Sequence, residues 1–146
     1  MDFEYFWEQL KGWVVKWIGV VIFLVVAGLL AWIRFAPDDV ARWHVAPAAV
    51  EDRDMEGGVM RARSGGLAAM NAIILAEPRT KVLAGSVESG MVTYVTRSKV
   101  MGFPDYTTVE QRGDMLALRA RLRYGKSDMG VNKARVERWL ADLGQE

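Results

Sequence analysis

The residues with the clearest chemical potential lie in the segment 121–135, RLRYGKSDMGVNKAR. Its glycines, its Ser-Asp pair and an asparagine just before a helical pattern make a loop that could turn backbone amides toward an anion. The candidate contacts of such a ligand are Lys126, Ser127, Asp128 and Asn132. The segment lacks the glycine frame of a P-loop. We favour a structural interpretation, in which Asp128 and Asn132 bond to local amides and cap the last helix.

A second candidate is a cationic sheet surface. Residues 116–124 alternate apolar and polar without interruption, as a half-buried antiparallel strand does, and place Arg119, Arg121 and Arg123 on the outer face. Arg97 and Lys99 share one face of an earlier strand. If these faces coincide, the surface suits an acidic partner subunit or anionic lipid headgroups. The alternative, which we favour, is an ordinary solvated face, and a nucleic-acid surface is not expected.

Catalytic acids are the third possibility. Asp105 and Asp128 are the acids that we would test in an active site. A catalytic carboxylate needs a partner and a pocket that shift its pKa, and the sequence identifies neither. His44, beside Trp43, is interpreted as an interfacial packing residue rather than a ligand or proton relay. We therefore expect no catalytic residue and no enzyme activity.

The composition excludes much of the usual redox and hydrolytic chemistry. The 146 residues include no cysteine and one histidine, and the formal net charge is +1. Disulfides, iron–sulfur ligation, thiol catalysis and c-type haem attachment are thereby excluded. A zinc site would use carboxylates almost alone, and a Ser-His-Asp triad would depend on His44. We expect no cofactor and no metal, and the balanced charge argues against a nucleic-acid partner.

An uninterrupted apolar run over residues 17–33 sets the class of protein. As a helix it would span about 26 Å, close to the ~30 Å hydrocarbon core of a bilayer. We predict a transmembrane helix over 13–35, preceded by an amphipathic interfacial lead-in over 1–12. Aromatic side chains flank the run as they do at membrane interfaces, and these are Trp7, Trp13, Trp17, Trp32 and Phe35.

The charges around this run bear on its orientation. Lys11 and Lys16 precede it, whereas Arg34 and Arg42 follow it. With the amino terminus added, the balance leans toward a cytoplasmic N-terminus and a periplasmic C-terminal domain in a bacterial inner membrane. A cleaved signal peptide is the alternative. We disfavour it because the apolar run is long and the residues before it include several acids.

The rest of the chain is expected to form one small α+β domain. Residues 36–63 contain two prolines and a glycine pair and are interpreted as a tether and irregular loop. The domain over 64–146 would have a four-stranded antiparallel sheet flanked by two helices. The helices are expected at 67–76 and 133–143, with Asn132 as the N-cap of the second. The strands are expected at 80–87, 91–100, 106–111 and 116–124.

Two runs of this sequence, GFPDYTTVE at 102–110 and the stretch 118–143, resemble a family catalogued as domain of unknown function 1499. The resemblance covers residues 67–143. The family pattern has an aromatic residue followed by paired acids where this chain has FPDY at 103–106, so only Asp105 remains of the pair. The resemblance implies a domain boundary and no established activity. It is most specific at Gly125, Ser127, Asp128, Gly130, Asn132 and Arg135.

These features favour a non-catalytic accessory or assembly subunit of an inner-membrane complex, respiratory or photosynthetic. One helix would anchor it, and its periplasmic domain would cover a partner, so the expected partners are a larger membrane-protein complex and membrane lipids. The alternative is a membrane-tethered module that binds a lipid or another small ligand through the sheet and the loop at 125–132. An enzyme using Asp105 and Asp128 is the third hypothesis.

Overall fold

The computed structural model describes residues 2–48 and 51–145, and the chain divides into two compact units at Ala36 and Pro37. The first unit is a single helix, α1 (Phe3–Phe35), so the predicted lead-in and span form one continuous helix. No side chain in its most apolar stretch is buried. The helix is long and apolar enough to cross a membrane, features that an N-terminal signal sequence shares.

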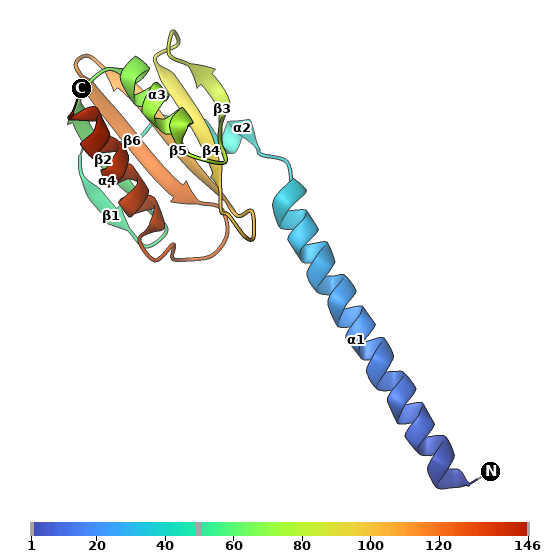
Figure 1. Cartoon of the computed structure of the whole chain (residues 1–146). Helices are drawn as coiled ribbons and strands as arrows, with labels where there is room; N and C mark the ends of the chain where they lie inside the picture. Colours follow the sequence, from blue (N-terminus) through green and yellow to red (C-terminus); the bar gives the residue numbers. More distant parts are fainter. Residues whose placement is uncertain (1, 49–50, 146) are drawn as a thin grey trace. The chain divides into compact units, whose positions relative to one another are not determined.

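The second unit is an antiparallel sheet with two helices on one face (Figure 1). The strands lie in the order β1-β2-β6-β5-β4-β3. Helices α3 and α4 cover one face, and a short helix, α2, lies in the segment that precedes β1. The bounds are α2 (Val40–Trp43), β1 (Arg53–Met55), β2 (Gly58–Ser64), α3 (Leu67–Ala76), β3 (Thr80–Ser86), β4 (Met91–Arg97), β5 (Pro104–Arg112), β6 (Met115–Leu122) and α4 (Val131–Leu143).

The α+β class and the antiparallel sheet are confirmed, but the prediction of four strands is wrong because the sheet has six. The two additional strands, β1 and all of β2 but its last residue, lie in the segment 36–63 that was expected to be irregular. Of the glycine pair there, Gly57 lies in the turn between β1 and β2, and Gly58 begins β2. A Cβ on Gly58 would lie 2.1 Å from the carbonyl oxygen of Ala120, so glycine at this position allows β2 to approach β6.

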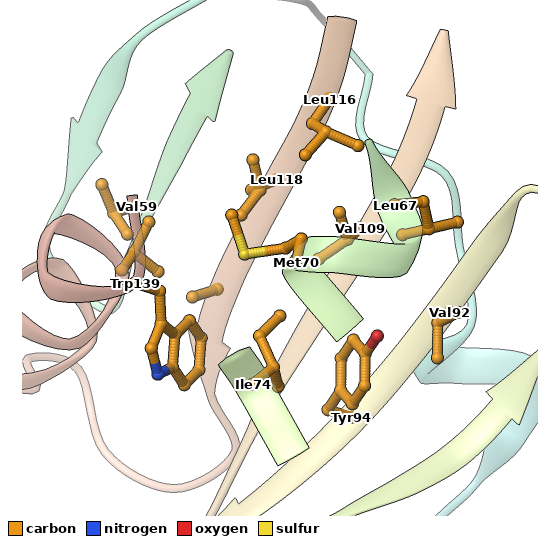
Figure 2. Close-up of a cluster of buried hydrophobic side chains, with 12 residues drawn as sticks. Val59, Leu67, Met70, Ile74, Val92, Tyr94, Val109, Leu116, Leu118 and Trp139 are labelled. Carbon is orange, nitrogen blue, oxygen red and sulfur yellow. The ribbon is translucent and has the colours of Figure 1, made fainter. Parts of the chain in front are cut away.

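The main core lies between the sheet and its two helices. The alternation in β6 turns Leu116, Leu118 and Ala120 toward α3 and α4, as predicted. Figure 2 shows Ile74 of α3 between Trp139 of α4 and Tyr94 of β4. The other fully or nearly fully buried members are Val59, Leu67, Met70, Val92, Val109 and Val136.

The opposite face of the sheet is covered by the chain itself. Residues 37–47, here called the strap, include α2 and run along this face from the end of β4 to the end of β5. At the far end the Arg112 guanidinium donates to the carbonyl oxygen of Pro47. Trp43 of the strap forms a second, smaller core with Leu83, Val95 and Tyr106. The segment after α1 is therefore part of the domain rather than a free tether.

Two neighbouring residues of α3 test the assignment of its buried face. Ile74 is fully buried, whereas Leu75 is 42% exposed. We expect Ile74→Ala to lower the free energy of unfolding of the domain by about 3 kcal/mol, because it leaves a cavity in the core. Leu75→Ala, with the same helix and the same replacement, should change it by about 0.5 kcal/mol or less. Pulse proteolysis of the full chain in urea and detergent measures both, and equal losses would contradict the assignment.

Candidate functional site

The two predicted basic faces coincide on the side of the sheet that the strap covers. Strand register aligns Val95 of β4 with Tyr106 of β5, and Tyr106 with Arg121 of β6. Arg97 and Arg123, two residues further along their strands, lie at the same end of this face. The arginines that sequence alternation placed on an outer face are thus neighbours, and most of them bind the strap.

Asp38 is the centre of this arrangement. Its carboxylate accepts hydrogen bonds from Arg97 Nη2 at 3.2 Å, from Arg123 Nη1 at 3.4 Å and from the Tyr106 hydroxyl. The Asp38 side chain is only 11% exposed, so two guanidinium groups balance a largely desolvated charge. Burial, reinforced by the hydrogen bond to Asp38, raises the pKa of Tyr106 to about 12. The phenol therefore stays a donor at physiological pH.

Trp43 is held against the sheet from two sides. Its ring stacks on Tyr106 with centroids 3.9 Å apart and an interplanar angle of 11°. The guanidinium of Arg121 lies 4.7 Å from the Trp43 ring centroid and donates to the carbonyl oxygens of Arg42 and Trp43. Burial lowers the pKa of Arg121, and the nearby charges of Arg119 and Arg42 add to this shift. Cation–π contact and carbonyl acceptors stabilise a guanidinium that has no carboxylate partner among the residues that the structure describes.

His44 continues the strap as a hydrogen-bonded residue of the domain. Its Nδ1 atom lies 2.9 Å from Thr93 Oγ1, which lies 2.9 Å from Thr108 Oγ1. The Thr108 hydroxyl in turn donates to the carbonyl oxygen of Trp43 at 3.2 Å. This chain of bonds explains why two threonines are buried on a sheet face. It places His44 in a packing role, with its ring bonded to the sheet.

The predicted contact residues fall into three groups. Three of them, Arg97, Arg121 and Arg123, bind the strap. The strap covers the face on which they lie, and their contact with a partner stays a prediction. Arg119 is half-buried, and its Nε atom has no hydrogen-bond partner among the described residues. Lys99 follows β4 in an exposed loop.

In the loop at 125–132, polar side chains accept hydrogen bonds from backbone amides of the same loop. Asp128 accepts from the amides of Gly130 and Asn132 at 3.0 and 2.9 Å, and Ser127 accepts from the amide of Met129. The structural role expected of Asp128 is confirmed, and amides that an anion would need are occupied. The prediction of Asn132 as N-cap is wrong, because α4 begins at Val131 and Asn132 lies inside its first turn. Lys126 is exposed.

Asn132 instead belongs to a buried polar cluster, here called the Asp105 cluster and made of Asp105, Asn132 and Arg135. Arg135 Nη1 lies 3.2 Å from Asp105 Oδ2 and donates to Asn132 Oδ1 at 3.0 Å. Burial raises the pKa of Asp105 above its ordinary value, although the Arg135 charge opposes the shift. This pairing was not predicted from the sequence, since 30 residues separate the two charges and no local period links them.

A second ion-pair group was also missed. The guanidinium of Arg61 in β2 is 7% exposed and contacts Asp54 at 2.7 Å and Glu137 of α4 at 2.6 Å. These bonds join the β1–β2 hairpin to α4. An open polar depression of about 430 Å³ lies over them. In the part of the chain that the structure describes, no cluster of three or more histidine or acidic residues is arranged to hold a metal ion.

Adjacent carboxylates of the strap allow a matched test of the Asp38 contacts. We expect Asp38→Asn to lower the free energy of unfolding by about 2 kcal/mol, because two half-buried guanidinium groups lose their counter-charge. Asp39 is exposed and accepts one 3.4 Å bond from the amide of Arg42, so Asp39→Asn should cost about 0.5 kcal/mol. Urea unfolding of the full chain in detergent compares the two, and similar losses would show that Asp38 is not the centre of the strap contacts.

The Asp105 cluster predicts a pH-dependent loss. Arg135→Met leaves a buried carboxylate unpaired, which raises the Asp105 pKa further and should cost about 3 kcal/mol at pH 7. The loss should shrink as the pH falls through that raised pKa, because protonation removes the unpaired charge. Arg138→Met on the same helix removes an ion pair with Glu77 whose arginine is 53% exposed, so it should cost under about 1 kcal/mol. A loss for Arg135→Met that does not vary with pH would contradict the role given to Asp105.

Comparison with known proteins gives a family without a described activity. The family described as "Protein of unknown function (DUF1499)" matches residues 35–143. The match extends beyond the 67–143 of the sequence resemblance and includes the strap, β1 and β2. No curated protein matches the chain. Because the match covers well over half of the sequence, the chain belongs to the DUF1499 family of proteins of unknown function.

Proposed function

We propose that the protein is a non-catalytic accessory or assembly subunit of an inner-membrane complex, respiratory or photosynthetic, with its N-terminus in the cytoplasm and its domain in the periplasm. The observation that carries the proposal is the strap. Only Ala36 and Pro37 separate the end of α1 from Asp38, which is bound to the sheet by two arginines. Such a short connection suits a module that is presented to a partner close to the membrane.

The internal use of the polar residues supports the non-catalytic part of the proposal. Asp105 is paired with Arg135, Asp128 accepts from two backbone amides, and Asp38 accepts from two guanidinium groups. A general acid or base must be free to exchange a proton with a substrate. Apart from the buried Ile33, most large apolar side chains of α1 are exposed, which leaves them available for lateral contact with other membrane helices.

A second candidate function, binding of a lipid or small ligand, is favoured by one observation. The Nδ2 atom of Asn132 and the Oγ1 atom of Thr107 are buried and lack hydrogen-bond partners among the described residues. Leaving such atoms unpaired costs about 1–3 kcal/mol each, which a small polar ligand would offset. Native mass spectrometry of the delipidated full chain tests this: a retained small molecule supports a binding module, and a mass equal to the chain alone rejects it.

Affinity purification tests the subunit proposal. The full chain, tagged at its C-terminus, is isolated from native membranes in mild detergent and its partners are quantified by mass spectrometry. We expect a stoichiometric set of membrane subunits with the wild type and with Asp39→Asn. Recovery should fall severalfold with Asp38→Asn at matched chain abundance, since the domain is then no longer fixed to the strap. A wild-type chain that purifies alone would overturn the proposal.

A further inference from the structure

The end of the domain nearest Asp38 carries an exposed apolar and basic surface that no ion pair or core explains. Two loops form it, 98–103 after β4 and 123–130 after β6, here called the tip. Figure 1 shows both loops leaving the same end of the sheet. They are in contact, since the Phe103 and Tyr124 rings lie 6.2 Å apart and the amide of Arg123 donates to the carbonyl of Pro104.

The tip exposes large side chains that would normally be buried. Val100 is 82% exposed and Met129 is 92% exposed, and Met101 and Phe103 are partly exposed beside them. Met129 has a positive φ of 51°, a conformation that is unfavourable for a side chain other than glycine, and a bond from its amide to Ser127 holds it there. The loop at 98–103 is equally ordered, because the Ser98 and Phe103 backbones are bonded to each other.

Two lysines supply the exposed charge of the tip loops, since Arg123 and Asp128 are half-buried and already bonded. Lys99 and Lys126 are both exposed, one in each loop. The turns at the opposite end of the sheet have a different character, with Glu88 and Ser89 in one and Asp114 in the other. Apolar side chains bordered by lysines are typical of surfaces that enter the headgroup region of a bilayer. The acidic turns at the other end have neither property.

The short connection between α1 and the domain favours the lipid bilayer as the surface that the tip contacts. Asp38 is bound between Arg97 and Arg123, the residues that begin the two tip loops. Ala36 and Pro37 connect Phe35, at the end of α1, to Asp38, and the three Cα–Cα steps from Phe35 to Asp38 span at most about 11 Å. If α1 crosses the membrane, the tip stays within reach of the headgroups. We propose that the tip is a membrane-docking surface, in which Val100 and Met129 enter the lipid interface and Lys99 and Lys126 contact anionic headgroups.

The absence of cysteine from the sequence makes this proposal directly measurable. Single cysteines replace Val100, Met129 or, as the control at the opposite end, Asp114, all of them exposed. Each full chain carries an environment-sensitive fluorophore and is reconstituted in nanodiscs of phosphatidylcholine with or without phosphatidylglycerol. At positions 100 and 129 we expect a blue-shifted emission and a severalfold lower quenching by aqueous iodide than at position 114.

Two further arms distinguish a lipid surface from a protein partner. Lys99→Glu combined with Lys126→Glu should remove the added protection that phosphatidylglycerol gives, without altering position 114. Equal iodide quenching at all three positions would overturn the proposal. Protection at 100 and 129 in native membranes but not in nanodiscs would also overturn it, because a protein partner rather than lipid would then cover the tip. Neither outcome depends on whether affinity purification recovers a partner complex.

Discussion

The fold of this domain depends on how one buried carboxylate compensates a row of arginines. Arg97 and Arg123 converge at one end of a sheet face, with Arg121 nearby, and like charges at that spacing repel. Asp38 supplies the counter-charge for two of them, and the ring and carbonyl of Trp43 accept the third. The arginines of the sheet therefore need the strap for their hydrogen-bond acceptors, and the strap needs these arginines to hold it on the sheet. With it in place, a domain of modest size buries both faces of its sheet.

The sequence predicted the elements whose evidence is local. Helix α4 has apolar residues at helical spacing, α3 is a short apolar run closed by Pro78, and β6 alternates, so these three elements could be located without a structure. The strands β1 and β2 could not. The first is three residues long, and the second begins with Gly58, which serves a close backbone approach that only the folded neighbour reveals.

The candidate sites were also predictable only where the evidence in the sequence is local. Alternation correctly placed the arginines on the outer face, but it carries no information about what covers that face. The contacts of Asp38 join residues 59, 68 and 85 positions apart, and no period in the sequence records such pairs. Asn132 illustrates the opposite error. A residue type typical of caps lies inside the helix, because its buried amide serves Arg135 rather than the helix terminus.

The strap also sets the order in which the molecule can be completed. Residues 37–47 are synthesised directly after α1, yet the groups that hold them lie between residues 93 and 123. Long-range contacts of this kind form only when both partners exist and the intervening loop has closed. Trp43 can therefore pack against the sheet only after β4, β5 and β6 have been synthesised and paired. The segment nearest α1 is the first part of the domain to be synthesised and among the last to form its tertiary contacts.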